Sequence, residues 1–441
     1  KVLPVIESFF IYHRQKGGTE HFQNFCERSK RILNQLVKQN PFLLNDTLHS
    51  LVTHFYNLLD FENKRNYFRT EIRKLRNDRG YDTIKLNVRR QQMFMDSFHQ
   101  LKVRSPSEMY GKLKIQFIGE EGVDVGGLTR EWYALLAREI FNPNYALFNP
   151  SANGVSFQPN SKSYINPDPL SFFKFVGRII GKAICDGVAL DVYFTRSFYK
   201  HILGQEVRYN DMEDLDPDFY RNLQMLTEIN LDDNDLHEYY FAYEEEEFGR
   251  IVMKELVPGG KNIRVTETNK MDYIKEICHM KMTKEINSQI QNFLEGFYEM
   301  VPKHLVGIFD AKELELLIAG LPEIDITDLK LNTEYRNYTK DSQVIQWFWE
   351  ILFEFTYEER AEFLQFVTGS AKVPLEGFKA LQGMGGVQKF QVHKSFTGPD
   401  RLPTAHTCMN QLDLPEYPSK EVLYQRLKIA ISEGKEGFAF M

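Results

Sequence analysis

Helical spacing of apolar residues dominates most of this chain, and this pattern constrains the fold more than any other feature. In residues 32–37 and again in residues 48–55, apolar side chains recur every three or four positions. Alternation of apolar and polar residues, which is typical of strands, is limited to residues 113–117, 390–393 and 402–408. The sequence therefore predicts an α+β protein in which a large, mostly helical part precedes a small α/β part.

The small α/β part is predicted from capping signals near the end of the chain. Thr356 and Glu359 have the spacing of a capping box, and the helix that they begin is expected to end at Gly369. Ser419 is expected to cap a last helix. At the other end, the polar run 76–80 is the best linker after a helical extension. The pattern thus predicts an extension, a helical body and a compact C-terminal unit.

Length and composition limit the class of protein. With 441 residues the chain is long enough for two or three units, and its 42% hydrophobic and 26% charged residues are typical of a soluble globular protein. No apolar run approaches the ~18 residues that span a bilayer, and no signal peptide is visible. The net charge of −7 gives no general attraction to nucleic acid. We therefore expect neither a membrane protein nor direct nucleic-acid binding.

The four cysteines lie at positions 26, 185, 278 and 408 and have no close spacing. This argues for free thiols in a reducing compartment, so we expect a protein of the cytoplasm and nucleus. A start at Lys1, without a methionine and inside a helical pattern, suggests part of a longer chain.

Cys408 differs from the other cysteines because it lies in a polar run, residues 401–414, rather than in an apolar helix. A thiolate is nucleophilic near neutral pH, and a thioester formed on it still reacts readily with an amine. If the run is a strand, His406 and Cys408 point to one face. Cys408 can equally be a small hydrophobic residue of that strand. A metal ligand is disfavoured because His-x-Cys has no second ligand pair.

The segment around Cys408 carries a resemblance to a known family. Leu-Pro-Thr-Ala-His-Thr-Cys, followed by an Asn, a Leu and Leu-Pro-Glu-Tyr, resembles the active-site signature of the HECT ubiquitin-protein ligases. The resemblance extends from about residue 86 to residue 441. Residues 1–85, with the motif Asp60-Phe-Glu-Asn-Lys-Arg-Asn-Tyr-Phe68, resemble the stretch that precedes the HECT domain in the very large HUWE-type ligases.

This resemblance implies a bilobal fold. The implied parts are a helical extension (1–85), an N-lobe (86–335) with an inserted subdomain that binds the conjugating enzyme (about 220–317), a hinge (336–340) and a C-lobe with the catalytic cysteine (341–441). The hinge residues are Tyr335, Arg336, Asn337, Tyr338, Thr339 and Lys340. The alternative for this segment is a plain loop between helices.

The resemblance also implies the reaction. A conjugating enzyme hands ubiquitin to Cys408 as a thioester, which then passes to a lysine amine of a substrate protein or of ubiquitin, without a metal or organic cofactor. His406 shapes the site or assists the proton transfer, and Thr407 directly precedes the nucleophile. Asp124 helps the incoming lysine lose its proton, and Phe438 is needed for transfer to substrate.

Simpler roles stay open for three of these residues. Asp124 also suits a turn or a helix cap, and Phe438 lies near the terminus, where order is usually lost. Along an extended strand, His406 is about 7 Å from the thiol and too far to act as its base without a bend.

The implied partners are a conjugating enzyme, ubiquitin and substrate proteins. Leu223, Leu226 and Tyr273 match the residues that bind the conjugating enzyme, with Tyr273 as an exposed aromatic anchor; the alternative is that all three belong to the core. In part of the family, residues matching Tyr145 and Phe248 hold a second ubiquitin. A second copy of the chain is a further candidate partner, because the helical extension could form the contact of a homodimer.

Two rival classes remain. A cysteine hydrolase acting on ubiquitin conjugates would need a histidine and an orienting Asn or Asp that converge on Cys408. A non-catalytic helical scaffold would make the polar setting of Cys408 an accident. Met409 departs from the HECT pattern, which usually has phenylalanine there, and since both are apolar we expect altered packing rather than lost activity.

Overall fold

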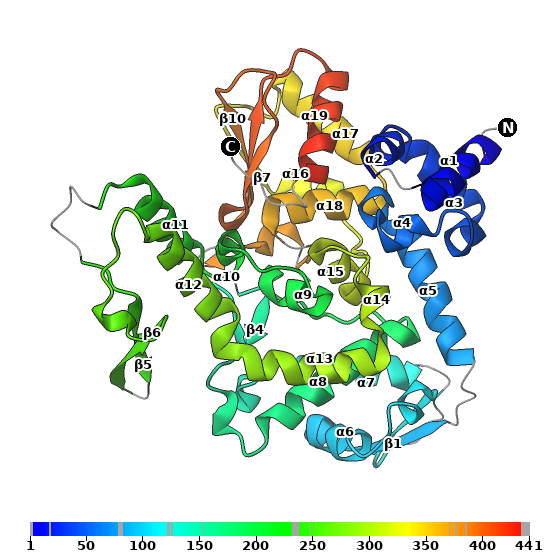
Figure 1. Ribbon diagram of the computed structural model, residues 1–441, viewed down its shortest axis with the longest axis vertical. Coiled ribbons are helices and arrows are strands. Elements are labelled where there is room, and N and C mark those ends of the chain that lie inside the picture. Colours follow the sequence, from blue (N-terminus) through cyan, green and yellow to red (C-terminus); the bar gives the residue numbers. More distant parts are fainter. Residues whose placement is uncertain are drawn as a thin grey trace. The chain divides into compact units, whose positions relative to one another are not determined.

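The computed structural model describes residues 3–16, 19–77, 83–120, 124, 127–152, 154–231, 238–247, 249–369, 371–374, 377–383 and 386–433. Helices predominate and the strands form small sheets, which confirms the α+β class (Figure 1). Two compact units are present. Unit 1 comprises Lys1–Asn142, Ser171–Val192 and Asn292–Leu321, and unit 2 comprises Pro143–Leu170, Tyr193–Gln291 and Pro322–Met441. No described helix is long and apolar enough to cross a membrane.

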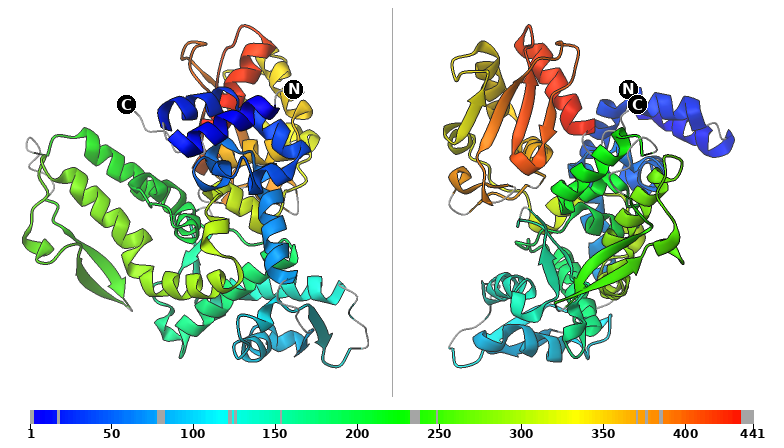
Figure 2. Two further views of the ribbon diagram at one scale, coloured as in Figure 1. Left: turned by 45° about the vertical axis from the view of Figure 1, so that its right-hand side comes forward. Right: turned by 90° about the vertical axis from the view of Figure 1, so that its left-hand side faces the viewer.

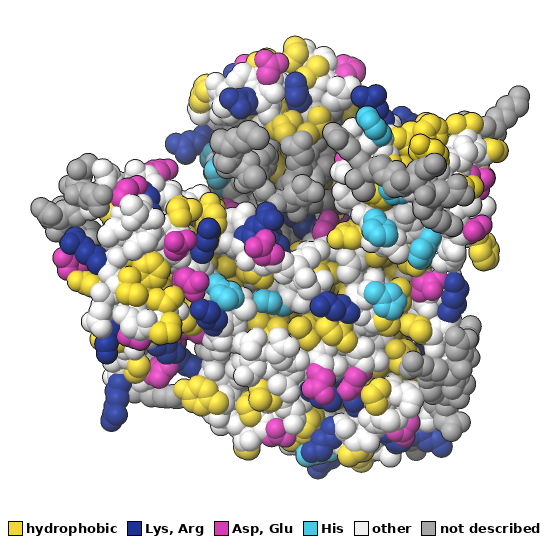
Figure 3. All heavy atoms as spheres, viewed as in Figure 1, with side chains coloured by type: hydrophobic (Ala, Val, Ile, Leu, Met, Phe, Trp, Pro, Cys, Tyr) yellow, Lys and Arg dark blue, Asp and Glu magenta, His cyan; other side chains and the backbone are white. Residues whose placement is uncertain are grey.

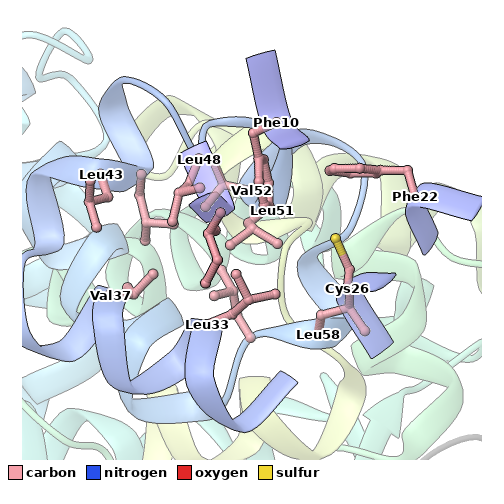
Figure 4. Packing of buried hydrophobic residues seen from close by; sticks show 13 residues of the cluster. Phe10, Phe22, Cys26, Leu33, Val37, Leu43, Leu48, Leu51, Val52 and Leu58 are labelled. Atoms are coloured by element: carbon pink, nitrogen blue, oxygen red, sulfur yellow. The ribbon is translucent and has the colours of Figure 1, made fainter. Parts of the chain in front are cut away.

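Unit 1 begins with a small helical bundle that has its own core. Its elements are α1 (Leu3–Lys16), α2 (Thr19–Arg28), α3 (Lys30–Gln39), the turn η1 (Pro41–Asn45), α4 (Ser50–Thr53) and the turn η2 (Tyr56–Leu58). Leu33, Val37 and Leu51 are at most 1% exposed, and Figure 4 shows them packed with their neighbours between the helices. The predicted helical spacing in residues 32–37 is confirmed.

The long helix α5 (Phe61–Asn77) joins this bundle to the rest of unit 1 (Figure 2). On the bundle side, the buried Asn34 side chain accepts from the Asp60 N–H at 2.8 Å and so fixes the start of α5. On the other side, Lys64 Nζ lies 2.7 Å from Glu313 Oε2 of α15 (Ala311–Ala319), and both side chains are only 4% exposed. A buried ion pair therefore anchors α5 to the body of the unit.

A short parallel sheet follows α5. β1 (Ile84–Val88) pairs with β2 (Leu113–Phe117), and the turn η3 (Arg90–Gln92), α6 (Met93–Leu101) and the turn η4 (Glu108–Tyr110) connect them. The apolar spacing of residues 87–101 also predicts a helix from about residue 87, and this is wrong in its first part, because alternate residues of β1 are buried and β1 pairs with a strand distant in the sequence. A domain border at 85/86 would cut this strand.

Two crossing helices form the frame of unit 1. α8 (Pro169–Asp186) crosses α13 (Asn287–Met300), with α7 (Gly127–Ile140) and α14 (Lys303–Val306) in the same unit (Figure 1). A Cβ added at Gly177 would lie 2.0 Å from the Phe293 carbonyl oxygen, and one added at Gly296 would lie 1.9 Å from the Lys174 oxygen. The backbones of α8 and α13 therefore touch at two glycines.

The crossing predicts a large cost for Gly177→Ala. Because the clash is with backbone, the helices must move apart, and we expect the free energy of unfolding to fall by about 3 kcal/mol. Chemical denaturation measures the change. Gly127→Ala is the matched control, since no described atom lies within 4 Å of its added Cβ; equal stability of the two variants would contradict the close crossing.

The first part of unit 2 is a helical subdomain with a hairpin. Its helices are α9 (Arg196–Leu203), α10 (Met212–Leu215), α11 (Pro217–Glu228) and α12 (Lys270–Met282), and its strands are β3 (Phe148–Pro150), β4 (Phe157–Pro159), β5 (Ala242–Glu247) and β6 (Arg250–Glu255). Short turns are η5 (Pro143–Tyr145), η6 (Ser163–Ile165), η7 (Tyr209–Asp211), η8 (Gly260–Asn262) and η9 (Lys284–Ile286). One apolar core extends from Met212 to Met282. Residues 292–317, which were predicted to belong to this subdomain, group with unit 1.

The second part of unit 2 is an α/β unit at the end of the chain. Its elements are α16 (Ile326–Leu331), β7 (Thr333–Arg336), α17 (Gln343–Glu354), α18 (Tyr357–Thr368), η10 (Phe378–Ala380), β8 (Gln382–Gly383), β9 (Gly386–Val387), β10 (Phe390–Ser395), β11 (Thr404–His406), η11 (Thr407–Met409), β12 (Gln411–Pro415) and α19 (Lys420–Glu433). Four strands form a sheet in the order β11-β12-β10-β7 (Figure 2). The capping box of Thr356 and Glu359 and the stop at Gly369 are confirmed.

The segment predicted as a hinge begins inside this sheet. Tyr335 and Arg336 belong to β7 and pair with Val392 and His393 of β10. The buried Tyr338 side chain donates its hydroxyl hydrogen to the Leu414 carbonyl oxygen at 3.1 Å. These residues are therefore held by the C-terminal unit, and a hinge at 336–340 stays a prediction.

Candidate active site

Cys408 lies in a tight turn between two strands rather than in a strand. β11 ends at His406, the turn η11 covers Thr407–Met409, and β12 begins at Gln411. The prediction of a strand through residue 408 is wrong after His406, because a 3-10 turn replaces the extended backbone there.

Asn410 closes the turn, and sequence reasoning assigned it no role. Its backbone is left-handed, with φ +49° and ψ 39°, a conformation that asparagine tolerates better than most residues. The fully buried side chain donates from Nδ2 to the Gln388 oxygen at 2.8 Å, and its backbone N–H donates to the Thr407 oxygen at 3.2 Å. An asparagine two residues after a candidate cysteine was the available signal.

A polar cluster lies beside the turn on one face of the sheet. His406 Nε2 donates to Asp413 Oδ2 at 3.0 Å, and Gln411 Nε2 donates to Asp413 Oδ1 at 2.7 Å. His393 of β10 lies across from Asp413 in the parallel register, with Nδ1 4.0 Å from Oδ1. The alternate residues of these strands, Val392 and Leu412, are completely buried. The sheet therefore has an apolar inner face and a polar face next to Cys408.

The charges of this cluster are set by its hydrogen bonds. The bond to Asp413 raises the pKa of His406 above its ordinary value, although burial acts in the opposite direction. Partial burial raises the pKa of Asp413, but the hydrogen bonds from His406 and Gln411 outweigh burial, so this pKa lies below its usual value. Burial lowers the pKa of His393. The hydrogen bond between His406 and Asp413 thus favours the charged form of both groups.

The other three cysteines lie in different surroundings. Cys26 and Cys278 are at most 1% exposed, and the Cys185 thiol donates to the Met300 oxygen at 3.4 Å. Burial raises the pKa of each of these thiols to about 12. They are therefore protonated and unreactive near neutral pH.

This contrast predicts selective alkylation. Brief treatment of the folded protein with iodoacetamide at pH 7.5 should modify Cys408 first, because thiolates react and the other three thiols are held protonated. Peptide mass spectrometry after digestion measures the modified fraction at each cysteine. Equal modification of Cys26, Cys278 and Cys408 in the folded protein would contradict this assignment.

Asp124 has a local structural role. Its carboxylate accepts a hydrogen bond from the Ile115 N–H at 2.9 Å and another from the Thr129 hydroxyl, and so connects β2 with the first turn of α7. This is the turn-and-cap role that the sequence left open. Because Asp124 and Cys408 lie in different units, a role for Asp124 in the transfer stays a prediction.

The residues predicted to bind the conjugating enzyme lie in the core. Leu223, Leu226 and Tyr273 are 5%, 5% and 7% exposed, and the Tyr273 ring packs edge to face on Phe241. The expectation of an exposed Tyr273 is therefore corrected, because α12 turns this side chain toward the interior of the subdomain. A contact with a partner through these three residues stays a prediction.

The positions of the remaining predicted site residues do not indicate a function. Thr407 lies against the end of α18, where a Cβ added to Gly369 would be 3.5 Å from its Cβ. Tyr145 ends the short turn η5 and is half-buried, and its carbonyl oxygen accepts from Asn166. Phe248 and Phe438 lie outside the described residues. Among the residues that the structure describes, no cluster of three His, Cys, Asp or Glu side chains could hold a metal ion.

Comparison with known proteins adds the decisive observation. Residues 134–441, which include the turn with Cys408 and the polar cluster, match the family model described as HECT-domain (ubiquitin-transferase). The chain belongs to the HECT family. The HECT match covers most of the chain and includes the whole C-terminal α/β unit.

Similar proteins extend the HECT match to the helical extension. The chain is 51% identical over 434 residues to E3 ubiquitin-protein ligase UPL1 of Arabidopsis thaliana, covering 97% of this chain and 12% of the relative. It is 50% identical over 425 residues to E3 ubiquitin-protein ligase HUWE1 of Mus musculus, covering 95% of this chain and 10% of the relative.

With E3 ubiquitin-protein ligase TOM1 of Saccharomyces cerevisiae, the identity is 47% over 419 residues, which is 95% of this chain and 13% of the relative. The chain therefore spans about an eighth or less of these relatives. The predicted likeness to HECT ligases of the HUWE type is confirmed, and the hydrolase alternative is not supported.

Proposed function

We propose that this HECT chain is the catalytic part of a ubiquitin-protein ligase, with Cys408 as the residue that carries ubiquitin. The observation that supports this most is the setting of Cys408 within the matched HECT region, in a tight turn beside the polar cluster. The other three thiols, in contrast, have pKa values of about 12.

Two acyl transfers make up the reaction. In loading, the Cys408 thiolate forms a C–S bond to the C-terminal carbonyl of ubiquitin, and the conjugating enzyme's thiolate leaves with the electron pair of its own C–S bond. In discharge, a neutral lysine amine forms a C–N bond to the same carbonyl, and the Cys408 thiolate leaves. The amine proton passes to solvent or a nearby base. The bond energy is conserved in the thioester, so this chain needs no cofactor for the transfer.

The lobes and their motion form part of the same proposal. Residues 86–335 make an N-lobe that receives the conjugating enzyme, and residues 341–441 make a C-lobe that presents the thioester. Asp124 and Phe438 then act at the discharge step, and Tyr145 and Phe248 hold a second ubiquitin. The family match and the four-stranded sheet at the end of the chain support this arrangement. The free thiols agree with a place in the cytoplasm and nucleus.

The docking surface for the conjugating enzyme should use exposed neighbours of the three buried residues. In α11 the side chain of Met225 is 54% exposed, and in α12, which packs against α11, that of Met271 is 40% exposed. Figure 3 shows apolar side chains gathered over this subdomain, on the left of the view. A surface of this kind, with a buried aromatic below it, is suited to an apolar loop of a partner.

We expect Met225→Glu and Met271→Glu to slow loading from a charged conjugating enzyme by about tenfold, since a buried charge would face the partner. Phe42→Glu, at a side chain 79% exposed in the extension, is the control and should leave loading unchanged. Single-turnover loading measures the rate. Unchanged loading in both methionine variants would place the docking surface elsewhere.

A homodimer through the extension is a separate proposal. Val5, Phe9 and Tyr12 of α1 are 45–62% exposed, and a second copy of the chain would remove these side chains from water. Sedimentation at several concentrations, with and without the first 59 residues, tests it: a concentration-dependent mass that is lost on truncation is expected, and a monomer throughout would exclude it.

The proposed function is tested by a chase experiment. A conjugating enzyme is charged with labelled ubiquitin, ATP is removed, and the chain is added with or without free lysine. We expect a ubiquitin adduct that reductant releases, followed by conjugates on lysine. Release of free ubiquitin without adduct or conjugate would contradict a transferase.

A further inference from the structure

The polar cluster beside Cys408 is built across three strands with matched register. His406 of β11 lies opposite Gln411 of β12, Gln411 lies opposite Gln391 of β10, and Asp413 lies opposite His393. Because side chains repeat every two residues along a strand, all five project from the same face. Asp413 is the centre, since both of its oxygens accept hydrogen bonds from other members.

The hydrogen bond from His406 fixes the protonation of its ring. A carboxylate can only accept, so the Nε2 atom of His406 must carry the proton of the 3.0 Å bond to Asp413. The Nδ1 atom takes part in no hydrogen bond with the described part of the chain. A second proton on Nδ1 therefore makes the ring an imidazolium that remains bound to Asp413.

The charged groups that face His406 favour this cation. Asp413 of β12 and Glu213 of α10 both attract it. His393 of β10 opposes it only when protonated, and burial and Arg336 of β7 both lower the pKa of His393. The described surroundings thus contain two attracting carboxylates and no fixed positive charge that acts on His406 directly.

We propose that Asp413 is a positioning residue for ubiquitin transfer: it holds His406 as an imidazolium at the start of the turn that carries Cys408, and this cation stabilises the Cys408 thiolate. A cation next to a cysteine lowers the pKa of the thiol. The same thiolate attacks in loading and leaves in discharge, so one fixed charge assists both steps. The part of this inference that concerns ubiquitin rests on the proposed function.

The first test needs no ubiquitin. The rate at which iodoacetamide alkylates Cys408 is measured against pH in the wild type and in Asp413→Asn, which keeps the shape of the side chain and removes its charge. Iodoacetamide forms an S–C bond and releases iodide, so the rate follows the thiolate fraction. We expect a rate about tenfold lower at pH 7 in the variant and equal rates at high pH, since a shift of one unit in the thiol pKa changes the thiolate fraction tenfold.

Further variants separate positioning from folding. Asp413→Glu keeps the charge and should recover part of the rate. Glu416→Gln, at an exposed acid that pairs with Lys394 just beyond β12, is the control and should alkylate like the wild type. Because Asp413 acts through His406, the double variant Asp413→Asn with His406→Gln should behave like His406→Gln alone. Additive losses, or the same profile in Asp413→Asn and wild type, would overturn the proposal.

The second test uses ubiquitin and can fail independently. Discharge of the ubiquitin thioester to free lysine is followed from pH 5.5 to 9 in wild type and Asp413→Asn. The ratio of the two rates should peak where His406 is charged in the wild type and neutral in the variant, and approach one on either side. A ratio that does not depend on pH would overturn the role in transfer. If no thioester forms even in wild type, the proposed function fails, whereas the alkylation result still decides the role of Asp413.

Discussion

Replacing Cys408 by alanine is expected to abolish both the ubiquitin adduct and every conjugate that the chain makes. The reason is chemical: alanine has no nucleophile, and the other cysteines have pKa values of about 12 and cannot substitute at neutral pH. Because two acyl transfers pass through one sulfur atom, the loss should be complete rather than partial. Non-reducing gels of a single-turnover reaction measure it.

Cys185→Ala is the matched control for this experiment. It removes a thiol of the same protein at a place without the polar cluster, and it should keep the adduct and the conjugates. Folding of both variants is compared by thermal unfolding. Conjugates formed by a folded Cys408→Ala protein would show that ubiquitin reaches lysine without this residue.

Lys64→Met is expected to lower the free energy of unfolding by about 3–5 kcal/mol, because it removes the cation that pairs with the buried carboxylate of Glu313. The Glu313 carboxylate also accepts from the Asp310 N–H at 3.0 Å in a capping box, and a neutral N–H interacts with a carboxylate more weakly than a cation does. The helix α5 would then lose its main polar anchor on α15. Denaturant unfolding followed by circular dichroism measures the change.

Two further variants show whether this effect belongs to the buried pair. Lys38→Met removes an ion pair with Glu62 whose side chains are 62% and 37% exposed, and water screening limits that loss to about 0.5 kcal/mol. The double variant Lys64→Met with Glu313→Leu replaces both charges by apolar groups and should recover much of the stability. An equally small loss for Lys64→Met and Lys38→Met would contradict a buried anchor.

Local signals predicted the helices well. The capping box at Thr356 forms as expected, and α18 ends at Gly369 in the left-handed conformation that glycine adopts most easily. These features depend on residues three or four positions apart, so the sequence contains them directly. The strand β10 was predicted for the same reason, because Phe390 and Val392 alternate with polar neighbours.

Long-range pairing could not be predicted from the same signals. β7 and β12 join β10 from positions 57 residues before and 20 residues after it in register, and nothing local specifies such a partner. The strand before Cys408 was predicted to extend too far, to residue 408, because the polar residues of the turn also fit a strand. The proposed role of Asp413 depends on the register of three strands, and the spacing of residues within one segment does not predict that register.

The sequence also does not show which apolar residues of a helix are buried in the core and which are exposed to a partner. Tyr273 and Met271 lie two residues apart in α12, yet the first is 7% exposed and the second 40%. Both are apolar residues of the same amphipathic helix, so their composition cannot show which of them meets a partner. The rotation of α12 against the core of its subdomain decides this, and that rotation is set by packing.

The measurement that tests the central claim most directly is the chemistry of the bond at position 408. Cys408→Ser should accept ubiquitin slowly from a charged conjugating enzyme and hold it as an oxyester that resists reductant and is cleaved by mild base. The wild-type adduct should instead be cleaved by reductant. A base-sensitive, reductant-resistant adduct on residue 408, located by peptide mass spectrometry, is the predicted result. A wild-type adduct located at any other residue would contradict the account.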